Sequence, residues 1–248
     1  MAAHQWDAHA YDRIADPQTR WGVAVLERLQ LRGDERVLDA ACGTGRVSEQ
    51  LLELIPGGKL VALDGDAAMI AEARGRLARF GERVEFVVAN LLEPLPLDAP
   101  VDAVFSTAAF HWIKDHERLF ANLAAVLRPG GQLVAQFGGE GNIETVLRAI
   151  RAAGDDWEGP WCYPTVEQTR ARLAAAGFPE PQVWLNLEPT PFETSEAFST
   201  FLEKVILGAH LMRKPEADRA AFVRAVVHNM AKPEIDYVRM NIVARKAG

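Results

Sequence analysis

The stretch Val37-Leu38-Asp39-Ala40-Ala41-Cys42-Gly43-Thr44-Gly45 decides the fold of this chain. Its apolar start is typical of a buried strand, its two glycines are typical of a sharp loop, and residues 46–54 are typical of the helix that follows. In parallel α/β sheets the first such loop lies at the carboxyl ends of the strands, where main-chain N–H groups bind nucleotide-like ligands. The stretch therefore predicts a strand, glycine loop and helix with a ligand site at the loop.

Two acids narrow the class of ligand. Asp39 precedes the glycines, where a carboxylate can receive a ligand ammonium group. A dinucleotide fingerprint keeps that position apolar and has a third glycine where this chain has Ser48, so a nicotinamide oxidoreductase is disfavoured. Asp64 ends the next apolar run, nineteen residues after Gly45, where a carboxylate can bind the two hydroxyls of a ribose. The two acids together indicate an amino acid joined to a nucleoside.

Composition excludes several other classes. With 248 residues and 49% hydrophobic composition, the chain is long enough to bury a large core. A net charge of −7, with no basic run longer than Arg213-Lys214, disfavours a general nucleic-acid partner. Cys42 and Cys162 form neither a disulfide framework nor a metal-ligand pattern, which fits a reducing, cytoplasmic setting. The chain shows no signal-peptide pattern and no apolar run of membrane-spanning length, so we expect no membrane partner.

The first half of the chain alternates regularly between predicted strands and helices. A helix over 19–31 precedes the first strand, the turn Arg128-Pro129-Gly130-Gly131 precedes the fifth, and the alternation predicts a doubly wound sheet. The elements expected between them are helices over 46–55, 66–80 and 115–127 and strands over 59–64, 83–89, 101–106 and 132–138.

The second half is less regular. Helices are expected over 142–153 and 166–176, the latter capped by Thr165, and strands over 182–187 and 235–244. About forty-five residues separate the last two strands, far more than a hairpin needs, and they include two helical stretches, 195–212 and 215–230. We interpret this insertion as a helical cap over the active site; a dimer interface is the alternative.

The motifs resemble those of the class I S-adenosylmethionine (SAM) methyltransferases. The acid followed by G-x-G at 39–45, Asp64 and the R-P-G-G turn at 128–131 carry this resemblance. Phe110-His111-Trp112, Tyr163-Pro164-Thr165, the stretch 191–202 and Tyr237-Val238-Arg239 are similar to small-molecule methyltransferases of the trans-aconitate methyltransferase type. The resemblance implies SAM as cofactor and S-adenosylhomocysteine as product. We expect an α/β fold with a Rossmann-like, doubly wound seven-stranded sheet, an antiparallel last strand and a helical cap inserted between the last two strands.

The same resemblance implies which residues bind the cofactor. Tyr11, Gln18 and Arg20 are expected to belong to an N-terminal lid over the cofactor, although a surface helix packed by Trp6 and Tyr11 is an equal alternative. Many relatives carry Asp where this chain has Asn90, which is interpreted as a reader of the adenine and alternatively as a turn former. The remaining expected cofactor contacts are Asp39, Ala41, Gly43, Gly45, Asp64, Gly65, Met69, Leu91 and Thr107.

His111 is the candidate catalytic residue, because it follows a strand at the edge where loops carry chemistry. It can act as a base for a hydroxyl or hold a carboxylate, and a purely structural hydrogen bond is the alternative. Trp112, Trp161 and Tyr163 are candidate walls of the substrate pocket, with core packing as the competing interpretation. Arg239 is the candidate cation for an acidic substrate, and no cluster predicts a metal.

We therefore expect a SAM-dependent methyltransferase of a small molecule, acting most readily as an O-methyltransferase of a carboxylic acid. The alternatives are methylation of malonyl-acyl-carrier protein or another metabolite, and a catalytically silent SAM-binding protein. We expect one domain over 1–248, as a monomer or homodimer. Its parts are an N-terminal lid and helix (1–31), a SAM-binding core (32–138), the second half of the core (139–187), a helical cap (188–233) and a final strand (234–248).

Overall fold

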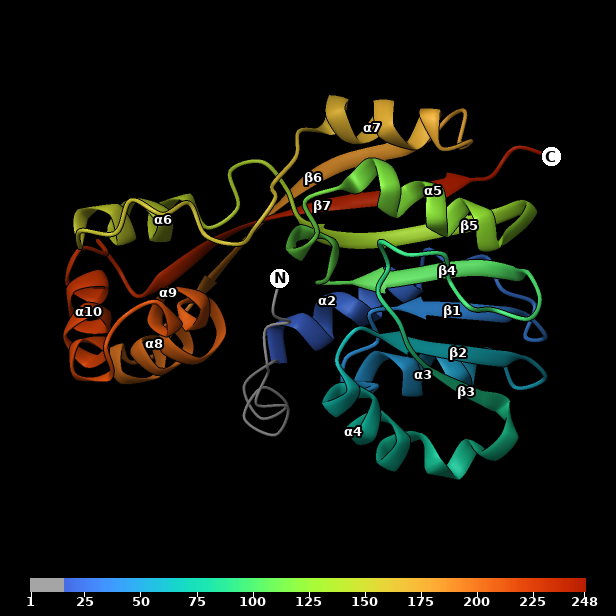
Figure 1. Ribbon diagram of the computed structural model, residues 1–248, viewed down its shortest axis with the longest axis horizontal. Coiled ribbons are helices and arrows are strands. Elements are labelled where there is room, and N and C mark those ends of the chain that lie inside the picture. Colours follow the sequence, from blue (N-terminus) through green and yellow to red (C-terminus); the bar gives the residue numbers. More distant parts are fainter. Residues whose placement is uncertain (1–15) are drawn as a thin grey trace.

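The computed structural model describes residues 16–248, and within them one seven-stranded sheet forms the centre of the molecule (Figure 1). The strand order is β3-β2-β1-β4-β5-β7-β6. β1 to β5 run parallel, and β7 lies antiparallel between β5 and β6, as the sequence predicts. The strands are β1 (Arg36–Ala40), β2 (Lys59–Asp64), β3 (Val84–Val88), β4 (Val101–Thr107), β5 (Leu127–Gly138), β6 (Gln182–Pro191) and β7 (Glu234–Arg245).

Helices cover both faces of this sheet. On one face, Val25, Leu26, Leu51, Leu52 and Leu77 pack against the strands from α2 (Asp16–Leu26), α3 (Arg46–Leu54) and α4 (Ala67–Leu77). On the other face, α5 (His116–Val126) and α7 (Val166–Ala175) cover the sheet. β1 is central and covered on both sides, so it is buried from Val37 to Ala40, with Asp39 as its one buried acid.

Helix starts follow the expected capping chemistry. The Asp66 side chain accepts a hydrogen bond from the Ala68 N–H at the start of α4. The side chains of Thr165 and Gln168 form a complete capping box at α7. α4 ends at Leu77, earlier than predicted, and the chain continues as a 3₁₀ helix, η1 (Ala78–Arg83), in which Gly81 has φ +55°. These helix ends shift the predicted boundaries without changing the order of elements.

β6 is longer than the sequence indicates. The prediction ends this strand at Leu187, whereas the structure continues it to Pro191. β6 lies at the edge of the sheet, where the N–H that a proline lacks is not needed for pairing with a second strand. Pro189 and Pro191 therefore pair with Asp236 and Glu234 of β7, and the two strands extend together beyond the core.

The extended ends of β6 and β7 carry a separate group of helices (Figure 1). Its helices are α8 (Ser195–Phe201), α9 (Gly208–Met212) and α10 (Glu216–His228), and a π-helical turn, η3 (Leu202–Ile206), divides the predicted stretch 195–212. The helix α6 (Glu144–Ala152) packs with them through Val146, Ala149 and Ile150. The inserted helical cap is thus present, and α6, which the sequence assigns to the core segment 139–187, shares the apolar cluster of the cap.

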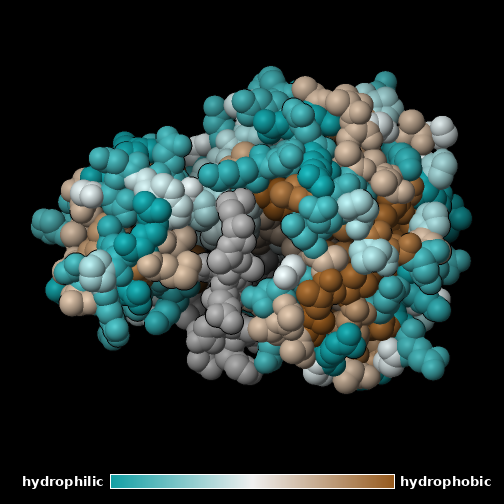
Figure 2. All heavy atoms as spheres, in the orientation of Figure 1, coloured by the Kyte–Doolittle hydropathy of each residue, from teal (hydrophilic) through white to brown (hydrophobic). Residues whose placement is uncertain are grey.

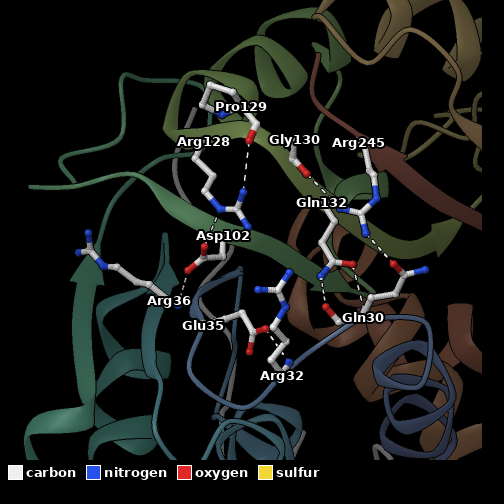
Figure 3. A network of polar contacts seen from close by, with 10 residues as sticks. All are labelled: Gln30, Arg32, Glu35, Arg36, Asp102, Arg128, Pro129, Gly130, Gln132 and Arg245. Atoms are coloured by element: carbon white, nitrogen blue, oxygen red, sulfur yellow. Dashed lines mark hydrogen bonds and ion pairs between the residues drawn. The ribbon is translucent and has the colours of Figure 1, made fainter. Parts of the chain in front are cut away.

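A polar network closes the edge of the sheet formed by the amino ends of β1 and β4 (Figure 3). Asp102 accepts hydrogen bonds from the Arg36 main-chain N–H at 2.8 Å and from Arg128 Nε at 2.6 Å. Arg245, near the end of antiparallel β7, binds the side-chain oxygen of Gln30 at 2.7 Å and the carbonyl of Gly130 at 3.0 Å. This edge is therefore cross-linked by side chains, and the carboxyl ends of the parallel strands lie at the opposite edge.

The surface distinguishes the two parts of the molecule. Figure 2 shows mostly hydrophilic side chains on the visible face of the cap and an apolar area in the middle of the visible core face. On that side of the sheet the segment 91–100 is a loop, and Leu92, Leu95 and Leu97 pack there while staying partly exposed. In the described residues, no helix is long and apolar enough to cross a bilayer.

Candidate active site at the carboxyl ends of the strands

The glycine loop has the predicted form, because β1 ends at Ala40 and α3 begins at Arg46. Ala41, Gly43 and Gly45 all have positive φ, at 68°, 56° and 79°. A Cβ added to Gly43 would meet no atom within 4 Å, so this residue faces open space. A Cβ on Gly45 would lie 3.3 Å from Ala73 and Leu77 of α4. Gly43 thus keeps the outer side of the loop clear, whereas Gly45 permits close helix packing.

Asp39 lies beneath this loop. Its side chain is 3% exposed and accepts a 2.6 Å hydrogen bond from the Ser48 hydroxyl. Burial raises the pKa of Asp39 to about 7, the Ser48 hydrogen bond opposes that rise, and the charge of Asp64 adds to it. Ser48, which occupies the place of the third glycine in a dinucleotide fingerprint, therefore has a role of its own as a hydrogen-bond donor to the first acid.

Asp64 joins the end of β2 to the glycine loop. One carboxylate oxygen accepts from the Gly43 N–H at 2.9 Å, and the other accepts from the Asp66 N–H at 2.9 Å. Burial raises its pKa, while these N–H groups oppose the rise. A carboxylate has about four lone-pair positions, so two remain for hydroxyl groups. The neighbouring Gly65 is exposed and Met69 is buried in the first turns of α4.

Asn90 follows β3 and shapes a turn. Its side-chain oxygen accepts from the Leu92 N–H at 3.0 Å, and its main-chain carbonyl accepts from the Glu93 N–H at 2.9 Å. Leu91 is buried, and its carbonyl accepts from the Asn122 amide. Asn90 therefore shapes a turn, and its role toward an adenine stays a prediction.

His111 lies where β4 ends in a constrained loop. After Thr107, Ala108 has φ +55°, and residues 110–112 form the 3₁₀ turn η2 (Phe110–Trp112). His111 is 9% exposed, and the Gly138 N–H donates to its Nδ1 at 3.3 Å. Since Nδ1 accepts, the proton of the neutral ring is on Nε2. Burial, followed by the charges of Arg239 and His116, holds the pKa of His111 well below its usual value. His111 is therefore a neutral hydrogen-bond donor at physiological pH.

An aromatic wall adjoins His111. Tyr163 stacks on the His111 ring with 6.2 Å between centroids, and Trp161 stacks on Tyr163 at 6.2 Å with only 12° between the planes. Trp112 contacts both His111, at 5.3 Å, and Trp161, at 5.9 Å. Burial raises the pKa of Tyr163, so its hydroxyl stays protonated. The candidate catalytic residue His111 and the three candidate wall residues thus form one cluster of rings.

Arg239 is the buried cation of this region. It is 3% exposed, and its guanidinium lies 4.7 Å from the centre of the Trp21 ring. Trp21 also packs edge-to-face on Tyr237 at 5.0 Å. The charge of Arg239 acts on both His111 and Tyr163. Trp21 lies in the predicted helix over 19–31, and helical spacing does not reveal that its ring covers a cation from β7.

Three predicted contacts fall outside what the structure describes. Tyr11 precedes the described residues, and Gln18 and Arg20 lie in α2 with side chains outside the description. Among the residues that are described, no group of three His, Cys, Asp or Glu side chains is placed to hold a metal ion. A hollow bordered by Arg36, Lys59 and Glu85 lies at the amino ends of the strands, away from the glycine loop.

Comparisons with known proteins agree with this geometry. Residues 37–131, which include the glycine loop, match the family model described as a methyltransferase domain. A trans-aconitate 2-methyltransferase of Variovorax paradoxus (strain S110) is 30% identical over 97% of this chain and 98% of that protein. A second enzyme of that name, from Acidovorax ebreus (strain TPSY), is 38% identical over 54% of this chain and 50% of its own length.

Solved structures share the fold at low identity. The YcgJ protein from Bacillus subtilis matches with a TM-score of 0.67 and 16% identity, covering 92% of this chain and 99% of that one. A Haemonchus contortus phosphoethanolamine N-methyltransferase 2 in complex with S-adenosylhomocysteine matches with a TM-score of 0.62 and 20% identity, covering 97% of this chain and 56% of that one.

The doubly wound sheet and the glycine loop with its two acids define a class I SAM-dependent methyltransferase. Within that class, the chain belongs to the family that contains the trans-aconitate 2-methyltransferases. SAM is therefore its methyl donor. The residues at the loop fit this cofactor, because Gly43 leaves its outer side open and Asp64 keeps acceptor positions for hydroxyls.

Proposed function

We propose that this methyltransferase transfers the methyl group to a carboxylate oxygen of a small organic acid, with trans-aconitate the first candidate. The observation that carries the proposal is the neutral donor His111 beside a buried cation, Arg239, behind an aromatic wall. The family supports it, since relatives that match along the whole chain carry the name trans-aconitate 2-methyltransferase.

The reaction asks little acid–base chemistry of the protein. When bound, SAM supplies a methyl group whose carbon is made electron-poor by the positively charged sulfonium. A carboxylate oxygen forms the new bond to that carbon as the carbon–sulfur bond breaks, which leaves a methyl ester and S-adenosylhomocysteine. A carboxylate is already ionised at neutral pH, so no base is required. The protein has to align the two groups and exclude water.

The described residues suit those tasks. The Nε2–H of His111 can donate to one oxygen of the acid, and Arg239 can attract its charge from behind the rings. Trp112, Trp161 and Tyr163 supply an apolar surface that keeps water out. The cofactor contacts in this proposal are the ones that the sequence indicates: Tyr11, Gln18, Arg20, Asp39, Ala41, Gly43, Gly45, Asp64, Gly65, Met69, Asn90, Leu91 and Thr107.

The direct test incubates the purified protein with methyl-labelled SAM and a panel of acceptors, followed by mass identification of labelled products. The panel holds trans-aconitate, related di- and tricarboxylates, malonyl-acyl-carrier protein and hydroxyl and amine metabolites. A labelled methyl ester of a small acid supports the proposal. Labelling of the carrier-protein substrate or of a hydroxyl or amine alone overturns it. Binding of S-adenosylhomocysteine without any turnover favours the catalytically silent protein.

A further inference from the structure

The cap contains a second histidine with unusual surroundings. His210 of α9 is fully buried, and its ring lies 4.8 Å from Trp157 and 5.7 Å from Trp161. Both tryptophans belong to the segment 155–163, which leads from α6 toward α7. A hydrogen bond joins its Nδ1 to the Asp155 carboxylate at 3.1 Å. His210 therefore connects a cap helix to the segment that carries the aromatic wall.

Asp155 fixes the tautomer and the orientation of that ring. Burial raises the pKa of Asp155, but the hydrogen bonds from Lys214, at 2.9 Å, and His210 outweigh burial and bring the pKa down to about 2. The carboxylate is therefore ionised and can only accept hydrogen bonds. Burial lowers the pKa of His210. Its Nε2 has no partner among the described residues, so a proton there would be a buried donor without an acceptor. The neutral ring thus carries its proton on Nδ1 and donates it to Asp155.

The segment between Asp155 and Tyr163 is shaped to hold Trp161 in one place. Gly159 has φ +82°, and a Cβ there would lie 2.4 Å from the Trp161 ring, so the ring lies directly against the backbone. The Trp161 ring also contacts His210 on the cap side and Tyr163 on the side of His111. Four rings, His210, Trp161, Tyr163 and His111, therefore run in contact from the cap to the end of β4.

We propose that His210, held by Asp155, is a positioning residue that sets the place of Trp161 and thereby the shape of the acid-binding wall. This inference rests on the proposed function for the identity of the substrate. His210 is separated from His111 by two rings and does not touch the reacting atoms in this role. The ion pair of Asp155 with Lys214, at 2.9 Å, also ties the start of this segment to the cap.

The kinetic test replaces the ring while monitoring folding by thermal unfolding. In His210→Gln, the side-chain amide lies farther from the backbone than Nδ1 of the histidine does. We expect the KM for the acid to rise about tenfold, with kcat less affected, because a small misplacement of a binding surface is costly. The dissociation constant of S-adenosylhomocysteine stays unchanged. His210→Asn restores an N–H near the position of Nδ1 and recovers most of the KM. His228→Gln, at the exposed end of α10, is the matched control and changes neither constant.

A second readout needs no substrate. Cys162 is half-buried in the same segment, and its N–H donates to the His111 carbonyl at 2.8 Å. Alkylation rates followed by peptide mapping report Cys162 and, as an internal control, Cys42 in the glycine loop. We expect His210→Gln to raise the rate at Cys162 several-fold and to leave Cys42 unchanged.

The two readouts separate the two hypotheses. If the native protein methylates no acid, the proposed function fails while the alkylation rates still decide the role of His210. A folded His210→Gln protein with native alkylation at Cys162 overturns the positioning role, as does a native KM in an active enzyme. A loss of thermal stability with both readouts native makes His210 a structural residue only.

Discussion

The main-chain N–H of Gly43 donates to the carboxylate of Asp64 at 2.9 Å, so the glycine loop after β1 and the end of β2 are joined directly. The two halves of the proposed cofactor site, which lie twenty-one residues apart in the sequence, are thus pre-organised by one hydrogen bond. Pre-organisation of this kind reduces the ordering that a ligand has to impose when it binds.

Replacing Asp64 tests this junction. Asp64→Ala removes the acceptors for the Gly43 and Asp66 N–H groups and for ribose hydroxyls, so we expect affinity for S-adenosylhomocysteine to fall about a hundredfold or more, on the scale of two lost charge-assisted hydrogen bonds. Isothermal titration calorimetry measures the change. Asp115→Ala removes a different carboxylate at a helix start, the N-cap of α5, and is expected to keep native affinity. Equal losses in both variants would contradict the assignment of Asp64.

Asp39 predicts a pH dependence of folding stability. Its pKa is raised from 3.8 to about 7 by burial, so between those values the folded protein binds a proton that the unfolded chain has released. The free energy of unfolding therefore decreases as pH rises through this window. The Asn side chain of Asp39→Asn is neutral and still accepts a hydrogen bond from Ser48. We expect this variant to lose the pH-dependent decrease in the free energy of unfolding that Asp39 causes. Without ligand, it should be more stable than the native protein at pH 8.

Denaturant unfolding at pH 5 and pH 8 measures the effect of that change. We also expect Asp39→Asn to bind S-adenosylhomocysteine more weakly, since the ligand ammonium loses a negative charge beneath the loop. Parallel pH profiles for the native and Asp39→Asn proteins would show that Asp39 does not titrate in this window.

The neutral state of His111 predicts a flat pH profile for catalysis. Because its pKa lies well below the usual value, kcat for the acid should show no histidine inflection between about pH 6 and pH 8. His111→Phe removes the Nε2–H and should lower kcat/KM about a hundredfold, whereas His111→Gln retains an N–H near that position and should retain part of the rate. Initial rates across pH test this. An inflection near neutrality that disappears in His111→Gln would instead identify a base.

Arg239 offers a test of substrate charge. Arg239→Met keeps an apolar stem beside Trp21 but removes the buried cation, so we expect the KM for a polycarboxylate to rise about tenfold or more and affinity for S-adenosylhomocysteine to stay native. Arg245→Met lies on the same strand at the cross-linked edge and is the matched control. It should lower thermal stability slightly without changing the KM. Native kinetics in a folded Arg239→Met protein would remove Arg239 from the substrate site.

The sequence predicts the proposed cofactor half of the site because its signals are local. Asp39, the two glycines and Asp64 lie on consecutive elements of one strand–helix–strand unit, and their spacing alone brings them to one edge of the sheet. The loop geometry confirms that expectation. What the spacing cannot give is the partner of each side chain, such as the Ser48 hydroxyl on Asp39.

The proposed substrate half depends on contacts between distant segments. Arg239 meets Trp21 from the other end of the chain, and Trp161 meets His210 across the cap insertion. Neither pair leaves a periodic signal, so the sequence alone does not reveal the contact of His210 with Trp161. The continuation of β6 past its prolines is missed for a similar reason, because only the sheet order shows that β6 is an edge strand.

The antiparallel strand β7 fixes the position of Arg239 relative to His111 independently of the cap. Arg239 pairs in register with Gly138, and the Gly138 N–H holds His111. The residues that link β6 to β7 can therefore change in length and sequence while the cation keeps its place beside the histidine. Under the proposed function, a cap of different sequence would admit a different acceptor while Arg239 and His111 keep their relative positions.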